Sequence, residues 1–74
     1  MKQNKYKVLL VEDEDNIRNL VATILDTAGY QTILATSCSS AQMMHTSYLP
    51  DLIILDLGLP DMDGMHFLSF VRRN

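Results

Sequence analysis

Short apolar runs alternate with helical patterns along the chain, and this alternation limits the folds that the chain can adopt. Lys7 to Val11 is apolar after its first residue, as expected of a central parallel strand covered on both faces. Tyr30 to Ala35 mixes β-forming residues with polar ones, which suits a half-exposed edge strand. Leu52 to Leu55 is a third apolar run, and its composition predicts a buried strand.

The clearest helical pattern follows the first run. Helix-start residues occupy positions 13–16, and Gly29 stands where a C-terminal cap belongs. Between them, apolar residues at helical spacing predict one inner face, made of Ile17, Leu20, Val21, Ile24, Leu25 and Ala28.

Two weaker helical patterns come later in the chain. Ser39 or Ser40 can cap a second helix that runs to about Tyr48 and ends before Pro50. Its expected inner face consists of Ala41, Met44 and Tyr48. A third helix is predicted to begin near Met65, with Leu68 and Val71 facing inward.

Alternating strands and helices indicate βαβ units and therefore an α/β fold with a doubly wound parallel sheet. The third strand is the most apolar and the second the least, which favours the strand order 2-1-3 with the first strand in the middle. In that order the chain changes direction between the first and third strands. Ligands bind at such a switch point, outside the carboxyl ends of the strands.

Length and composition restrict the class of protein. The 74 residues suit a single domain, 1–74, and the 47% hydrophobic fraction fits a globular chain. The net charge is −3 and the six Lys and Arg residues form no basic stripe, which argues against direct nucleic-acid binding. The single cysteine, Cys38, excludes an internal disulfide and is interpreted as a small polarisable filler near a helix start. Because no apolar stretch is long enough for an export signal or a membrane span, we expect a soluble cytoplasmic chain without membrane contact.

Carboxylates follow two of the predicted strands. Glu12 and Asp13 come directly after the first strand, and Asp56 comes directly after the third. Because the carboxyl ends of parallel strands share one edge of the sheet, we expect these three side chains to converge. Hard oxygen ligands of this kind select Mg²⁺, and an aspartate beside such a metal can attack phosphorus. The pattern predicts phosphoryl transfer onto Asp56, the only aspartate that directly follows a strand predicted to be buried.

The segments VLLVEDED (8–15) and DLIILDLGLPDMDG (51–64) resemble the first part of a bacterial response-regulator receiver domain. This resemblance implies a flavodoxin-like sheet that is incomplete here, and a phosphoryl group accepted by Asp56 from a sensor histidine kinase. It also implies that Asp13 binds Mg²⁺ directly and that Glu12 contacts the metal as a second ligand or through water. Gly58 would offer its backbone carbonyl to the metal. Pro60 and Gly64 would shape the loop.

The resemblance also has gaps. Receivers carry, in strands and helices beyond the matched part, a Ser or Thr and a Lys that contact the phosphoryl group. Lys2, Lys5 and Lys7 precede the first strand and so are expected to point away from the carboxylates. We therefore interpret the chain as a truncated receiver without an effector domain, a phosphoacceptor rather than an enzyme.

A second hypothesis is that the chain lacks the phosphorylation switch. In that case it would act only through self-association or by binding a complementing partner. The third strand would then present an apolar sheet edge, and such edges recruit other chains.

Overall fold

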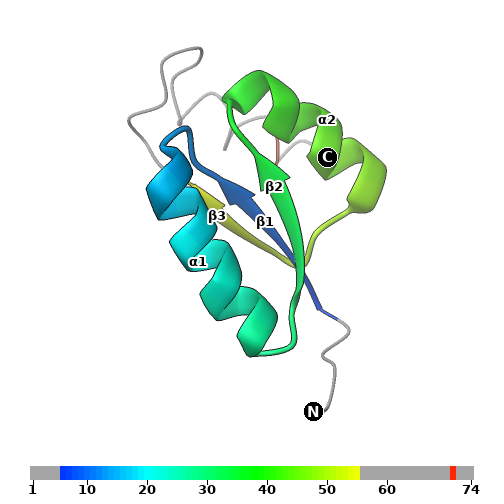
Figure 1. The fold of residues 1–74 in the computed structure, drawn as a ribbon. Helices are drawn as coiled ribbons and strands as arrows, with labels where there is room; N and C mark the ends of the chain where they lie inside the picture. The colour runs from blue at the N-terminus through cyan, green and yellow to red at the C-terminus, as the bar shows by residue number, and fades with distance from the viewer. Residues whose placement is uncertain (1–5, 56–70, 72–74) are drawn as a thin grey trace.

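The computed structural model describes residues 6–55 and Val71. Its strands are parallel and lie in the order β2-β1-β3, so the predicted α/β class and the order 2-1-3 are confirmed (Figure 1). In chain order the elements are β1 (Lys7–Val11), α1 (Asp15–Thr27), β2 (Gln31–Ala35), α2 (Cys38–Tyr48) and β3 (Leu52–Leu55).

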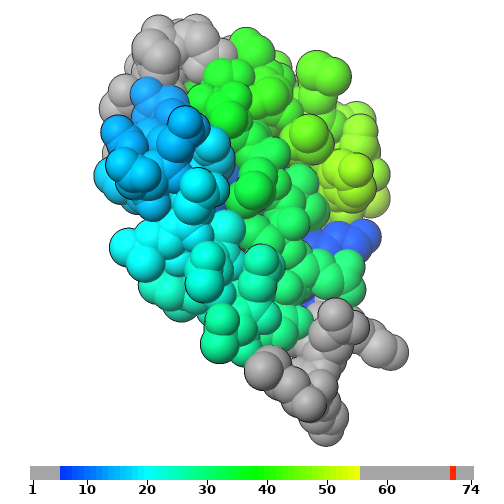
Figure 2. Space-filling view, viewed as in Figure 1, coloured from blue at the N-terminus to red at the C-terminus, as the bar shows by residue number. Residues whose placement is uncertain are grey.

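The two helices cover opposite faces of the sheet. Figure 1 shows α1 on one side and α2 on the other, which gives three layers. The step from β1 to β2 and the step from β2 to β3 run in opposite directions across the sheet. Right-handed crossovers therefore place the connecting helices on opposite faces. In the space-filling view, β2 reaches the surface between the two helices (Figure 2).

The core is centred on β1, the middle strand. Leu9 and Val11 are fully buried in a cluster with residues that begin α2, including Cys38 and Ala41. Val8 and Leu10 alternate to the other face of the sheet and are also buried. The interpretation of Cys38 as a small filler near a helix start is confirmed, since this thiol is buried in the cluster and is the first residue of α2.

The predicted inner face of α1 is partly wrong. Ile17, Leu20 and Ile24 are 50%, 62% and 58% exposed, and Ala28 is exposed as well. Instead, the buried side of the helix carries Ala22, flanked by the half-buried Val21 and Leu25. The physical reason is that the apolar stripe is wider than the contact that one helix makes with β1 and β2. Periodicity identifies the stripe but does not say which part of it is covered.

The ends of the helices follow capping chemistry, with one correction. Gly29 has φ 93°, a left-handed conformation open to glycine, so its predicted role after α1 is confirmed. The N-cap of α2 is Ser37, not Ser39 or Ser40. Ser37 Oγ accepts from the Ser40 backbone N–H at 3.1 Å, and Ser40 Oγ accepts from the Ser37 N–H at 3.2 Å. This capping box begins the helix earlier than predicted.

Two further expectations about burial are corrected. Tyr48, predicted to face inward, is 49% exposed because it lies in the last turn of α2, whereas Ala41 is buried and Met44 packs against the core. β3 has the predicted bounds, but Leu52 is 56% exposed and its other residues are only half-buried. Among the described residues β3 pairs with β1 alone, so its other edge has no strand partner within residues 6–55.

Only one residue of the predicted third helix is described. Val71 is helical and half-buried, and it packs against the core cluster around Leu9, as predicted. The predicted start near Met65 and the inward-facing Leu68 lie outside the described residues.

Candidate functional site at the carboxyl end of β1

The strand register defines the position of the candidate site. Val11, the last residue of β1, pairs with Leu55, the last residue of β3. Glu12 and Asp13 therefore leave the sheet beside the point where the chain continues from β3 to Asp56. Asp56 and Gly58, like Pro60 and Gly64 of the following loop, lie outside the described residues.

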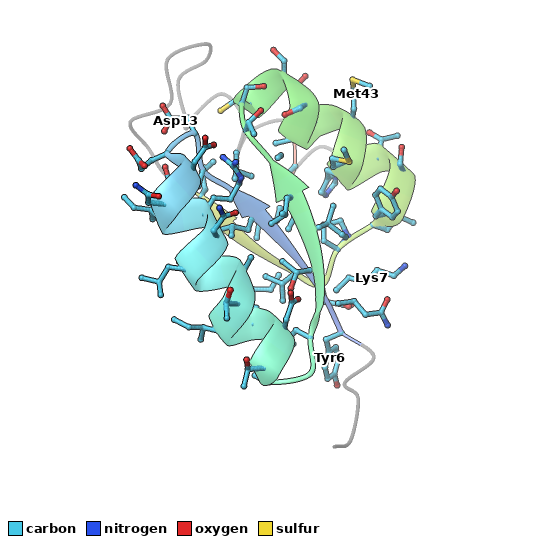
Figure 3. All side chains as sticks on the ribbon, in the orientation of Figure 1. Tyr6, Lys7, Asp13 and Met43 are labelled. Atoms are coloured by element: carbon cyan, nitrogen blue, oxygen red, sulfur yellow. The ribbon has the colours of Figure 1, made fainter. Side chains whose placement is uncertain are left out.

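Figure 3 shows Asp13 at the opposite end of the molecule from Tyr6 and Lys7. Lys7 donates from Nζ to the backbone oxygen of Tyr48 at 3.1 Å, and its backbone N–H donates to Asp51 Oδ2 at 2.8 Å. The expectation that Lys7 points away from the carboxylates is confirmed. Lys2 and Lys5 lie outside the described residues.

Glu12 is a charged residue with little contact with water, and only 8% of its surface is exposed. Its backbone N–H donates to the Ala35 carbonyl at 3.0 Å, which extends the β1–β2 ladder by one bond. Its carboxylate Oε2 accepts from the backbone N–H of Glu14 at 3.2 Å. A buried carboxylate is costly unless hydrogen bonds or a cation compensate its charge. The neighbouring Asp13 is exposed, so a buried and an accessible carboxylate stand side by side.

The other two residues of the acidic run serve the helix. Glu14 is the N-cap of α1, and its Oε1 accepts from the Asn16 backbone N–H at 3.0 Å. Asp15 is the acidic residue of the first turn, where negative charge favours the positive end of the helix dipole. Glu14 and Asp15 thus act as helix-start residues, as expected, while Glu12 and Asp13 precede the cap.

Arg18 also contacts this end of the sheet, and the sequence analysis missed it. Its Nη1 donates to the backbone carbonyl of Glu12 at 3.1 Å, and its Nη2 lies 2.5 Å from Asp15 Oδ1. Only 14% of the Arg18 side chain is exposed. The sequence did contain a signal for the ion pair: Arg18 follows Asp15 by three residues, and oppositely charged residues at this spacing on a helix are neighbours.

The donor chemistry at this edge fits a hard divalent cation. Within residues 6–55 no group of three His, Cys, Asp or Glu side chains gathers around one point. Mg²⁺, however, is commonly held by one or two carboxylates together with water and phosphate oxygens. Glu12 and Asp13 provide two such carboxylates on consecutive residues. Their assignment as ligands stays a prediction, as does that of Asp56 and Gly58.

A parallel sheet of order 2-1-3 with an acidic loop after its central strand defines a class of α/β domains that bind ligands at this edge. Residues 8–74 match the response regulator receiver domain family, and the chain belongs to that family. Receiver domains are signalling domains of two-component systems.

Relatives and solved structures agree with this assignment. The chain is 42% identical over 66 residues to the KDP operon transcriptional regulatory protein KdpE of Escherichia coli, covering 89% of the chain and 29% of that protein. Among solved structures, the chemotaxis response regulator CheY4 of Vibrio cholerae superimposes with a TM-score of 0.88 at 35% identity, covering 93% of this chain and 57% of that one. The HemR receiver domain of Leptospira biflexa gives 0.87 at 29% identity, with 93% and 56% covered.

The chain spans under a third of the length of the curated relatives it matches, and little more than half of the structural neighbours. KdpE of Mycobacterium tuberculosis, for example, is 40% identical over 65 residues, which is 29% of its length. Neither of the helices α1 and α2 has the length and the apolar composition that a membrane-spanning helix requires.

Proposed function

We propose that the chain is a phosphoacceptor module of a two-component phosphorelay. Asp56 accepts a phosphoryl group from a sensor histidine kinase, and Mg²⁺ is held by Glu12, Asp13, Asp56 and the backbone carbonyl of Gly58. The observation that carries the proposal is the buried Glu12 beside the exposed Asp13 at the carboxyl end of β1, in register with the strand that leads to Asp56. Family membership supports the same reading.

Each residue has a definite part in this chemistry. A carboxylate oxygen of Asp56 attacks phosphorus, a P–O bond forms as the P–N bond to the kinase histidine breaks, and the imidazole leaves. Glu12 and Asp13 bind and orient the cation, and the low exposure of Glu12 strengthens its interaction with positive charge. The bound Mg²⁺ supplies charge that offsets the charge of the transferring phosphoryl group.

The module acts in the cytoplasm, with the kinase as its partner and without direct contact with nucleic acid or membrane. Like other receivers, it is a signalling domain rather than a classical enzyme. The curated relatives are named as transcriptional regulatory proteins. We propose that this chain also takes part in the control of transcription.

Small phosphate donors test the proposal without the kinase. The chain should gain one phosphate from acetyl phosphate or phosphoramidate in the presence of Mg²⁺, and none when the metal is chelated. Intact-mass spectrometry reports the adduct directly. If no adduct forms at any Mg²⁺ concentration, the isolated chain does not accept a phosphoryl group.

We also propose that the edge of β3 that faces away from β1 associates with a second copy or a complementing chain. Leu52 on this edge is 56% exposed, and within residues 6–55 only β1 pairs with β3. Unpaired apolar edges are templates for strand addition.

Association through the β3 edge can be tested by introducing one charged side chain. We expect the chain to self-associate in sedimentation velocity, and Leu52→Lys to shift it toward monomer, because edge lysines oppose strand addition. Leu34→Lys is the matched control, since Leu34 lies on the other outer strand, β2, and is 41% exposed. A folded wild-type monomer across the concentration series, or equal effects of the two lysines, would refute association through β3.

A further inference from the structure

Arg18 lies on the sheet-facing side of α1, an unusual place for a charged side chain. It precedes the buried Ala22 by four residues and the half-buried Leu25 by seven, which is the spacing of one helix face. Charged side chains are seldom this buried unless paired, and only 14% of the Arg18 side chain is exposed. Its position at the end of the first turn of α1 lets the guanidinium reach the carboxyl end of β1.

The contact that Arg18 makes there acts on the backbone that carries the predicted ligands. Its Nη1 donates to the carbonyl oxygen of Glu12 at 3.1 Å. That oxygen belongs to the planar peptide unit that joins Glu12 to Asp13. The same residue is held on its other side by the bond from its N–H to Ala35 O at 3.0 Å. Together these bonds fix the orientation of the peptide from which Asp13 projects.

The hydrogen bonds of Arg18 favour cation binding by ordering the ligands, whereas its positive charge disfavours cation binding. A guanidinium bonded to the Glu12 carbonyl repels a nearby Mg²⁺, so charge alone predicts that removing Arg18 tightens metal binding. Fixed ligand geometry predicts the reverse, because Mg²⁺ demands near-ideal octahedral coordination and tolerates misplaced oxygens poorly. The two effects can therefore be separated by experiment.

We propose that Arg18 is a positioning residue for the Mg²⁺ site: its guanidinium holds the Glu12–Asp13 peptide in the orientation that the cation needs, and this outweighs its repulsion of the cation. The inference rests on the proposed Mg²⁺ site, and it deepens that proposal. Asp15 has a subordinate part. Its side chain is 80% exposed, and exposed ion pairs contribute little, but its carboxylate directs the second nitrogen of the fork.

Three variants separate position from charge. Arg18→Met removes the hydrogen-bond donors and the charge together. Arg18→Lys keeps the charge but replaces the planar fork with a single nitrogen, which cannot donate to Glu12 O and Asp15 in the same geometry. Asp15→Asn is the matched control, because it removes the surface charge while keeping an oxygen acceptor for Arg18 Nη2. Far-UV circular dichroism checks that each variant keeps its helices.

The first readout is Mg²⁺ affinity, followed by amide chemical shifts in a titration with MgCl₂. We expect the dissociation constant to rise about 10-fold in both Arg18 variants, the lower end of the effect typical of groups that orient metal ligands. Asp15→Asn should change it by less than about 2-fold, as a screened surface charge does. Unchanged affinity in Arg18→Lys together with tighter binding in Arg18→Met would show that only the charge matters, and would overturn the proposal.

The second readout needs no metal. The Glu14 N–H donates to Glu12 Oε2, so its hydrogen exchange reports the local geometry of the loop. We expect faster exchange at Glu14 in both Arg18 variants and unchanged exchange in residues 22–27 of α1. If the wild-type chain binds no Mg²⁺, the metal part of the proposed function is wrong. If hydrogen exchange at Glu14 is unchanged in the Arg18 variants, the positioning role of Arg18 is wrong, whatever the result for Mg²⁺.

Discussion

Asp56→Asn should gain no phosphate from acetyl phosphate and Mg²⁺ under conditions in which wild type gains one. The carboxamide has no carboxylate oxygen to attack phosphorus, so the covalent step is lost and uptake should fall by at least roughly 1,000-fold. The substitution also removes one negative charge from the predicted Mg²⁺ ligands, which weakens cation binding. Intact-mass spectrometry over a time course measures both the extent and the rate of uptake.

Asp51→Asn is the matched control for this experiment. Asp51 precedes β3 and Asp56 follows it, so the two aspartates lie at opposite ends of the same strand. The amide oxygen that this substitution introduces can still accept the bond that Lys7 N–H now donates to Asp51 Oδ2. Wild-type uptake in the Asp56→Asn variant, or equal loss in the Asp51→Asn variant, would contradict Asp56 as the phosphoacceptor.

Leu9→Ala should destabilise the fold more than any other truncation in β1. Leu9 is fully buried at the middle of the central strand, and it belongs to the core cluster that includes residues of β2 and α2. Truncation of a buried leucine to alanine costs about 2–5 kcal/mol. Because a domain of 74 residues is stable by only about 4–11 kcal/mol, the truncation should remove a large share of the free energy of unfolding.

Urea denaturation followed by far-UV circular dichroism measures this effect. Leu20→Ala provides the control, since the chemical change is the same but Leu20 is 62% exposed on α1. We expect the control to lose no more than about 0.5 kcal/mol. Equal losses in the two variants would contradict the position of β1 at the centre of the core.

The strands and their order could be predicted because the sequence marks them locally. β1 and β3 have the predicted bounds, and β2 begins at Gln31, one residue later than expected. Polar residues, Gly29 and Pro50 separate these runs from the helices, and crossover handedness then leaves few arrangements of the strands. Local pattern and topology rules agree here, so the fold class followed from the sequence.

Burial was harder to predict because it depends on what lies opposite an apolar residue. Ile17 and Leu20 fit the helical period of α1, yet both are exposed since the described residues place only the Ala22 side of the helix against the sheet. The start of α2 was misplaced for a different reason. Several serines stand close together there, and only the backbone conformation shows that Ser37 is the N-cap.

The candidate site was predictable in its residue types more than in its geometry. Glu12 and Asp13 lie at the carboxyl end of β1, where parallel-strand topology places them. The spacing of Arg18 from Asp15 could have indicated their ion pair, but the bond from Arg18 to the Glu12 carbonyl was missed because backbone oxygens are the same at every position of the sequence. The roles of Asp56 and Gly58 stay predictions.

Convergence of Glu12, Asp13 and Asp56 on one cation is the central claim, and paramagnetic broadening by Mn²⁺ tests it most directly. Mn²⁺ takes the same hard oxygen ligands as Mg²⁺ and broadens the amide signals of nearby residues. We predict selective broadening at residues 12–13 and 56–58, with the signals of Lys7 and Tyr30 left sharp. Broadening at residues 12–13 without residues 56–58, or centred on Asp26 or Asp51, would contradict the claim.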